Sequence, residues 1–279
     1  MPIAEQLAAA AERFSPAERR VAEVVASDPH AVAFGTVAEL ARRSRTSGPT
    51  VVRFAARLGF SGFVDLQAAA QDEIADALRP AAARIRERPA TDVVGQALTA
   101  DVENVRSTLE AVDADEFAAA VALLGDQRRP VFVLAGEIAH GAGESFVTQL
   151  DLLREGVTAV SGSPVRVSRQ VAQIGRDAVV VAIEHRRYER WLIETLARTR
   201  TAGADVIAVT DSALSPVATG ARATFAVSAR GVGPFDSYVG TMSLLHALLA
   251  GVAARLRKSA TARLDAVEAA WTATNELIS

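Results

Sequence analysis

The residues Glu-His-Arg-Arg-Tyr-Glu-Arg at positions 184–190 directly follow the apolar run Val179–Ile183. Arg186 and Arg187 carry planar guanidinium groups, which bind carboxylates and phosphates through paired hydrogen bonds. Tyr188 adds a ring that can stack on a ligand and a hydroxyl that can bond to it. The apolar run predicts a buried strand, and ligands of parallel α/β sheets bind where strands end. This segment is therefore a candidate anion site.

A second group of arginines lies between residues 42 and 57, a segment with five arginines and no acidic residue. The stretch 1–79 as a whole is nearly neutral, with nine arginines against ten acidic residues. The positive charge is therefore concentrated in one place, as it is where proteins bind the phosphates of nucleic acids. The alternative is a helical hairpin whose arginine face is only solvated.

The composition limits the class of protein. The chain has 279 residues, enough for two modest domains; half of them are apolar, and the formal net charge is −3. Cysteine is absent, which excludes disulfides and thiolate metal sites and fits a reducing cytoplasm. The N-terminus does not have the pattern of a secretory signal, and no apolar run reaches the ~18 residues of a membrane span. We expect a cytoplasmic protein without membrane contact, metal or cofactor.

The arginine cluster falls on two predicted helices joined by a tight turn. Thr36 can cap the first helix, in which Val37, Leu40 and Ala41 share one face, and the second helix runs over residues 49–58. This is the layout of a helix-turn-helix, whose second helix lies in the major groove of DNA.

The second helix has two distinct faces in the sequence. Its inward positions at helical spacing are Val51, Phe54, Ala55 and Leu58. Thr50, Arg53 and Arg57 fall on the opposite face, and Ser47 is placed to cap the helix. Arg43 and Arg45 in the turn region are expected on DNA phosphates. The residues expected to contact DNA are thus Arg43, Arg45, Ser47, Thr50, Arg53 and Arg57.

Other helices are indicated by caps and spacing. Ser15-Pro16-Ala17-Glu18 predicts a helix start with a capping box, and Asp28-Pro29 predicts its end. A longer amphipathic helix is expected over residues 61–78. The segment 79–90, rich in arginine, alanine and proline, lacks a steady apolar face and is interpreted as an interdomain linker. Two further helices are expected over 91–111 and 114–125.

From residue 130 short apolar runs alternate with segments of helix length. The predicted strands are Val131–Ala135, Val157–Val160, Ala178–Ile183, Val206–Thr210 and Thr224–Val227. This alternation predicts a doubly wound parallel sheet of five strands, and the chain ends in helices over 237–257 and 260–278. The predicted fold is therefore an all-α helix-turn-helix domain (1–79), a linker and connecting helix (80–112) and an α/β domain (113–279).

Three segments of the N-terminal part resemble the RpiR/MurR family of bacterial transcription regulators. They read SPAERRVAEVV, TVAELARRS and GPTVVRFAARLGFSGFVDLQAA, and PTVVRF with LGFSGF is the most specific portion. The family joins a helix-turn-helix to a sugar-isomerase-type (SIS) domain that senses a phosphosugar. The resemblance covers most of the chain and implies a dimeric or tetrameric repressor or activator whose DNA affinity depends on a ligand.

The second domain departs from the family pattern at two loops. After the first strand the family has glycine, glycine and serine at alternate positions, where this chain has Gly136, Ile138 and His140. After the third strand the family pattern is Ser-x-Ser-Gly-x-Thr, whose hydroxyls and amides hold a phosphate. At those four positions this chain has Glu184, Arg186, Arg187 and Glu189. The fourth-strand segment does fit the family at Thr210, Asp211, Ser212, Ser215 and Pro216, and Ser237 resembles a family position.

Two interpretations of the altered loop stay open. The two arginines replace the hydroxyl cradle by guanidinium contacts to an anion, or the charged residues form a surface ion-pair network or subunit contact in a domain that no longer senses phosphosugars. On the first interpretation the ligand-binding residues are His140, Arg186, Arg187, Thr210, Ser212, Ser215 and Ser237.

The leading hypothesis is a transcription regulator, not an enzyme, with no catalytic residue assigned. Its expected partners are double-stranded operator DNA, a small anionic metabolite such as a sugar phosphate, and further copies of itself in a homodimer or homotetramer. One alternative is a phosphosugar isomerase, which needs a positioned acid or base, for which Glu144, His140 and Glu184 are the candidates. The other is a regulator whose second domain only assembles the oligomer.

Overall fold

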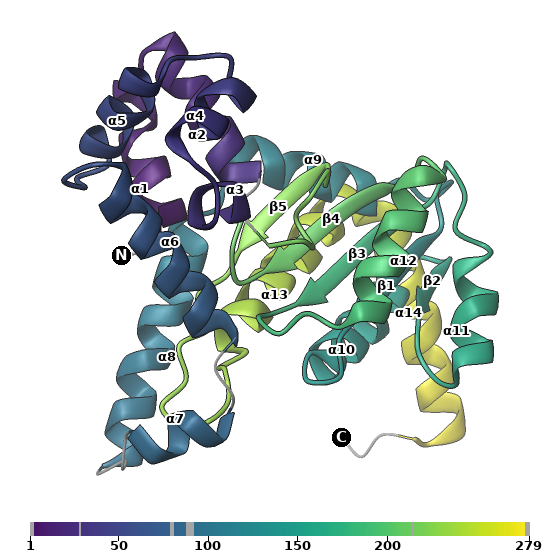
Figure 1. The fold of residues 1–279 in the computed structure, drawn as a ribbon. Coiled ribbons are helices and arrows are strands. Elements are labelled where there is room, and N and C mark those ends of the chain that lie inside the picture. Colours follow the sequence, from purple (N-terminus) through teal and green to yellow (C-terminus); the bar gives the residue numbers. More distant parts are fainter. Residues whose placement is uncertain (1–2, 28, 79–80, 88–91, 214, 277–279) are drawn as a thin grey trace.

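The computed structural model describes residues 3–27, 29–78, 81–87, 92–213 and 215–276. In these ranges the chain forms an all-helical N-terminal part and an α/β part with one five-stranded parallel sheet. Figure 1 shows the N-terminal helices gathered at one end and the sheet lying between layers of helices. The predicted fold class is confirmed.

The N-terminal helices pack around one apolar core. Leu40, Val51, Phe54 and Leu66 are fully buried at its centre, because their helices turn apolar stripes toward each other. The helices before residue 79 are α1 (Ile3–Ala10), η1 (Ala11–Arg13), α2 (Pro16–Ser27), α3 (Pro29–Ala33), α4 (Val37–Arg43), α5 (Gly48–Arg57) and α6 (Phe63–Leu78).

The predicted capping box at the start of α2 is confirmed. The Ser15 N–H donates to Glu18 Oε2 at 2.8 Å, and the Glu18 N–H donates to Ser15 Oγ at 3.3 Å. Thr36 caps α4 as predicted, because its side chain accepts from the Glu39 N–H. The predicted end of α2 includes Asp28, which lies outside the described residues.

The segment interpreted as a linker contains the short helix α7 (Ala81–Glu87), which the sequence did not predict. Its run of alanines has high intrinsic helix propensity, which outweighs the missing apolar stripe. Helices α8 (Val93–Glu110) and α9 (Ala114–Leu124) follow close to the predicted positions, although residues 79–80 and 88–91 lie outside the described residues. α8 packs along α13 (Val239–Arg255).

Five parallel strands form the sheet in the order β2-β1-β3-β4-β5. Each lies within two residues of its predicted bounds. The strands are β1 (Val131–Ala135), β2 (Val157–Ala159), β3 (Val179–Glu184), β4 (Asp205–Thr210) and β5 (Ala223–Ala226). The remaining helices are α10 (His140–Leu153), α11 (Pro164–Val171), α12 (Arg190–Thr201) and α14 (Arg257–Thr274), the last of which ends before the predicted residue 278.

The sheet is buried on both faces, which explains why its strands are apolar without polar alternation. In β3, Val179, Val181 and Ile183 point to the side of α9, α10 and α13, whereas Val180 and Ala182 point to the side of α12. Helices α10 and α12 thus cover opposite faces (Figure 1).

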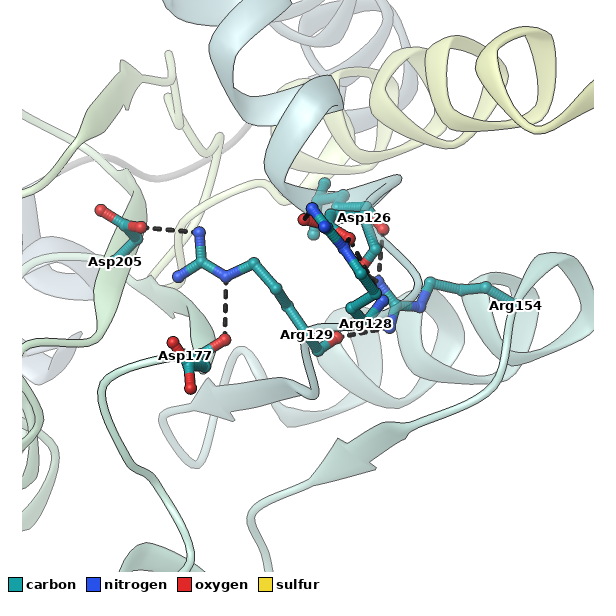
Figure 2. A network of polar contacts seen from close by, with 7 residues as sticks. Asp126, Arg128, Arg129, Arg154, Asp177 and Asp205 are labelled. Carbon is teal, nitrogen blue, oxygen red and sulfur yellow. Dashed lines mark hydrogen bonds and ion pairs between the residues drawn. The ribbon is translucent and has the colours of Figure 1, made fainter.

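Arginine side chains form a network of polar contacts at the edge of the sheet where the strands begin (Figure 2). Arg154 is 1% exposed, and its guanidinium donates to the carbonyl oxygens of Leu124, Asp126 and Arg129. These bonds fix the turn between α9 and β1 against the end of α10.

Within the described ranges, no single helix is long and apolar enough to cross a membrane. Helices α13 and α14 taken together are long and apolar enough, but the chain bends by 104° between them.

Candidate functional site

The turn between α4 and α5 has a defined geometry. Arg45 adopts a left-handed conformation with φ of 51°, and the N–H groups of Arg45 and Thr46 donate to the carbonyls of Arg42 and Ala41. This is a Schellman motif, which normally places glycine at the left-handed position. Arg20 of α2 donates to the carbonyls of Ser44 and Arg45 from its guanidinium. The turn that presents the arginine cluster is therefore held by the helix beneath it.

The inward face of α5 is as predicted. Its residues Val51, Phe54 and Ala55 are 0% exposed, and Leu58 is also buried. Arg53 and Arg57 are exposed on the other side, where Val52 is also 43% exposed. The sequence did not indicate Val52, because an apolar residue directly after the inward Val51 does not signal exposure. A thymine methyl group is the kind of base feature that such a side chain contacts.

One predicted DNA contact, Thr50, and one predicted helix cap, Ser47, need correction. Thr50 is 6% exposed, so it does not share the outer face with Arg53 as predicted. Ser47 occupies the N-cap position of α5, but its side chain makes no capping hydrogen bond to the helix amides. Instead the Ser47 Oγ lies 2.9 Å from Thr50 Oγ1, which also accepts from Arg53 Nη2 at 3.3 Å. Thr50 positions its neighbours from within the fold.

Arg57 is tied to the capping box of α2. Its Nη2 lies 3.7 Å from Oε1 of the buried Glu18. The Ser15 backbone N–H, more than the arginines, holds the pKa of Glu18 below its usual value, so this carboxylate stays charged. Arg43 and Arg45 are exposed at the end of α4 and in the turn. All five arginines of the predicted cluster thus face solvent on one helix-turn-helix: Arg42, Arg43, Arg45, Arg53 and Arg57.

The strand order identifies a second candidate site, at the ends of β1 and β3. The chain leaves β1 toward β2 on one side and returns to place β3 on the other, which opens a crevice where the loops diverge. The loop after β3 is the segment with Arg186, Arg187 and Tyr188, as the sequence predicts. The loop after β1 carries Gly136 and leads to His140, the first residue of α10.

Glu184, the last residue of β3, is buried in this crevice. The residue is 5% exposed, and its Oε1 accepts from the His185 N–H at 3.1 Å, whereas its Oε2 has no hydrogen-bond partner among the residues that the structure describes. A side chain at Gly136 would collide with this carboxyl group, so the glycine leaves the space that the Glu184 carboxyl occupies. Burial, with the charges of Glu189 and Asp211, raises the pKa of Glu184 to about 7.

The carboxylate of Glu189 connects the loop after β3 to the loop after β1. Its Oε1 accepts from the Glu137 N–H in the loop after β1, and its Oε2 accepts from the Trp191 indole N–H. A backbone N–H after the first strand is a group that an anionic ligand would use. The carboxylate of Glu189 therefore occupies an anion-accepting position of the crevice.

Arg186 is paired rather than open to the crevice. Its Nε lies 3.1 Å from Asp236 Oδ2, and Arg84 of α7 donates to the other oxygen of Asp236 at 2.7 Å. Asp236 thus connects the loop after β3 to the helix that follows the DNA-binding part. Arg187 is exposed and has a left-handed φ of 70°, so the backbone keeps the conformation that glycine favours at this position.

The hydroxyl residues at the end of β4 and in the loop after it form hydrogen bonds within the protein. Thr210 is 0% exposed and donates to Ser215 Oγ at 2.9 Å, and Ser215 also accepts from the Val217 N–H. Tyr188 donates to Asp211 Oδ1 at 2.9 Å, which ties the loop after β3 to the loop after β4. The neighbouring Ser212 is half-buried.

The two other predicted ligand residues lie apart from this cluster. His140 is more than half exposed, and its Nε2 lies 3.8 Å from Glu144 Oε1 one turn further along α10. Ser237 donates to Asp101 Oδ1 of α8 at 2.5 Å. The structure therefore gives Ser237 a bond to the connecting helix, which the sequence did not predict.

His185 is a residue of the crevice that sequence reasoning undervalued. It stacks on Tyr238 with ring centroids 4.4 Å apart, and its Nε2 lies 2.9 Å from Thr241 Oγ1. Burial lowers its pKa, so the ring is neutral at pH 7. An adjacent apolar hollow of about 560 Å³ lies between α10 and α13, lined in part by Tyr238, Phe146 and Met242.

Comparison with known families accounts for both parts of the chain. Residues 1–77 match the helix-turn-helix domain of the rpiR family, and residues 110–251 match the SIS domain. Among curated relatives, the bifunctional protein glk of Burkholderia orbicola (strain AU 1054) is 26% identical over 250 residues. That alignment covers 87% of this chain and 37% of the relative, so the chain spans little more than a third of that protein. HexR, an HTH-type transcriptional regulator of Pseudomonas aeruginosa, is 28% identical over 77% of this chain and 74% of its own length.

Solved structures agree with this assignment. The sugar isomerase domain of an RpiR transcription factor from Sphaerobacter thermophilus superposes with a TM-score of 0.58 and 27% identity, over 64% of this chain and 99% of that domain. The Vibrio vulnificus NanR protein, solved with ManNAc-6P, shares the fold over 98% of both chains with a TM-score of 0.56 and 17% identity. The chain belongs to the RpiR family of helix-turn-helix regulators that carry a SIS domain.

Proposed function

We propose that this protein is a DNA-binding transcription regulator of the cytoplasm whose operator affinity is set by a small anionic ligand, of the sugar phosphate kind, in its SIS domain. The observation that carries the proposal is the helix-turn-helix itself, with exposed arginines on one side and a turn held by Arg20. Two such elements in a homodimer or homotetramer would contact two half-sites.

The ligand would bind at the crevice between β1 and β3. Arg186 and Arg187 are the proposed anion contacts, and His140, Thr210, Ser212, Ser215 and Ser237 are the further predicted contacts. An anion that recruits Arg186 competes with Asp236, which also binds Arg84 of α7. The proposed ligand therefore changes the charge balance at the helix that follows the DNA-binding part, which supports coupling between the two domains.

We propose regulation rather than catalysis. The candidate acid and base groups do not form one constellation, because His140 and Glu144 pair on the exposed start of α10, whereas Glu184 is buried against Gly136. Solved SIS neighbours include a putative sugar-phosphate isomerase from Listeria monocytogenes at 16% identity and a TM-score of 0.52, which is a likeness of fold. Turnover of sugar phosphates that is abolished in Glu184→Ala or His140→Ala would overturn this choice.

The proposal is tested by titrating the protein into labelled DNA from the region flanking its own gene, in several salt concentrations. We expect specific, salt-sensitive binding that sugar phosphates strengthen or weaken. If no such fragment binds, with or without sugar phosphates, the proposal is wrong. If the protein binds DNA specifically and no anionic metabolite changes its affinity, the SIS domain does not sense a ligand and only assembles the oligomer.

Replacing Arg53 by alanine should weaken operator binding by about 1–3 kcal/mol if its guanidinium contacts a guanine. Arg53 is exposed on α5, and its guanidinium donates to Thr50 Oγ1 within the fold. Fluorescence anisotropy with operator and with unrelated DNA measures the change. Arg13→Ala, an exposed arginine outside the helix-turn-helix, is the matched control and should bind as the unmodified protein does. Equal affinity of the two variants would remove Arg53 from the interface.

Replacing Glu189 by glutamine should raise the affinity for sugar phosphates by roughly fivefold, or about 1 kcal/mol. The substitution removes a negative charge that borders the proposed anion position and keeps an oxygen that can accept from the Glu137 N–H. Isothermal titration calorimetry with a panel of hexose phosphates measures the effect. Glu194→Gln, an exposed carboxylate on α12, controls for the overall change in charge. Unchanged or weaker binding in Glu189→Gln alone would contradict the role given to this carboxylate.

A further inference from the structure

A second polar hollow lies at the opposite edge of the sheet, where the strands begin. It has a volume of about 450 Å³ and lies between the end of α9, the loop 125–129, the residue before β5 and the end of α13. Its charged lining consists of Asp126, Arg128, Arg129, Arg222 and Arg255. Four arginines and one aspartate thus line a single hollow.

Two of these arginines are neutralised by carboxylates. Arg128 forms two parallel bonds to Asp126 at 2.9 and 2.8 Å, and Arg129 pairs with Asp205 at 2.8 Å (Figure 2). Within the described residues, Arg222 and Arg255 form no ion pair. Arg255 lies across Gly125, where a Cβ would come within 2.7 Å of its Cδ, so the glycine leaves room for the arginine at the hollow.

A further positive charge lies behind the loop. Figure 2 shows the Arg154 side chain reaching toward Asp126 and Arg128 from the end of α10. Its hydrogen-bond partners are carbonyl oxygens, and the nearest opposing charge is that of Asp126, which Arg128 already shares. A buried guanidinium without a carboxylate of its own raises the potential around it and favours a bound anion.

The end of α9 does not account for the two unpaired arginines. The carbonyl of Leu124, at the end of that helix, already accepts from Arg154. Neither Arg222 nor Arg255 is therefore required to satisfy it, and both extend into a hollow bounded by the same loop. The lining of the hollow thus contains two guanidinium groups that no carboxylate of the described residues neutralises.

We propose that this hollow binds a multiply charged oxyanion, such as the phosphate or diphosphate group of a small metabolite, at a site separate from the crevice between β1 and β3. Arg222 and Arg255 supply the unpaired guanidinium groups, and Arg128 and Arg129 complete the rim. The anion links the loop 125–129 to α13, so it stabilises the native SIS domain by mass action.

The test uses inorganic pyrophosphate and inorganic phosphate as probes, with the full chain at roughly physiological ionic strength. Calorimetry and thermal unfolding are recorded for the unmodified protein and for Arg222→Ala/Arg255→Ala. Arg198→Ala, an exposed arginine on α12, is the control for net charge. Arg186→Ala removes a proposed anion contact of the crevice and so reports how much of the binding belongs to that site. We expect pyrophosphate to bind and to raise the melting temperature, and the double variant to bind at least roughly tenfold more weakly. We expect Arg198→Ala to bind as before, and Arg186→Ala to keep the part of the binding that the double variant loses.

Three results would overturn the proposal. The first is no binding of either probe by the unmodified protein. The second is equal loss in Arg198→Ala and in the double variant, which would mean nonspecific attraction to a basic chain. The third is binding that Arg186→Ala abolishes and the double variant keeps, which would assign the anion to the crevice alone. Because the two sites have separate variants, failure here leaves the proposed regulation through the crevice intact.

Discussion

Replacing Arg154 by alanine is expected to lower the free energy of unfolding by about 3–5 kcal/mol. The side chain is 1% exposed and donates to the carbonyls of Leu124, Asp126, Arg129 and Glu155. Each buried carbonyl that loses its donor costs about 1–3 kcal/mol, and the lost side chain leaves a cavity. Relief from burying a charge offsets part of this loss.

Urea unfolding followed by circular dichroism measures this change. Arg128→Ala is the control, because Arg128 belongs to the same network but its side chain is 90% exposed and it pairs only with Asp126. We expect little change in that variant. If Arg154→Ala unfolds at the same urea concentration as Arg128→Ala, the buried network does not hold the turn between α9 and β1.

The second large effect is a pH dependence that arises from Glu184. Its pKa is raised from 4.5 to about 7, first by burial and then by the charge of Glu189. The folded chain thus keeps this proton up to about pH 7, whereas the unfolded chain loses it near pH 4.5. The contribution of Glu184 to stability is fully present below pH 4.5 and is lost as the pH rises to 7, by about 3 kcal/mol in total.

Replacing Glu184 by glutamine, a neutral isostere, should remove this dependence. At pH 8 we expect Glu184→Gln to be more stable than the unmodified protein by about 2–3 kcal/mol, and at pH 5 the two should be nearly equal. Urea unfolding at both pH values gives the difference. The comparison with Glu184→Gln is needed because His185 adds a pH dependence of the opposite sign. Burial lowers the pKa of His185, so its contribution to the stability of the fold is lost as the pH falls.

Glu189→Gln is the matched control for this experiment. Its carboxylate accepts two hydrogen bonds and is a secondary cause of the raised pKa of Glu184. We expect this variant to lose less stability between pH 5 and pH 8 than the unmodified protein does and more than Glu184→Gln does, because burial still raises the pKa of Glu184. A constant difference between Glu184→Gln and the unmodified protein across this range would mean that Glu184 titrates at its ordinary pKa in the folded chain.

Both effects come from groups that no sequence pattern marks as buried. Arg154 follows α10 as one arginine among many, and Glu184 ends an apolar strand beside six other polar residues. A charged residue after a strand is usually solvated, so the sequence did not exclude a surface ion-pair network at this loop. In the structure Glu184 is buried and Glu189 bonds to the loop after β1, so the two carboxylates belong to the crevice and not to such a network.

The sequence by itself determined the elements and the family. The capping box at Ser15, the alternation of apolar runs after residue 130 and the spacing on α5 depend on neighbours in the chain, so local patterns suffice for them. Only the tertiary structure decided which polar groups meet. The burial of Thr50, the pairing of Arg186 with Asp236 and the bond from Ser237 to α8 each join residues whose contact depends on how helices and loops pack. Sequence spacing carries no information about such contacts, because they are set by the packing of segments far apart in the chain.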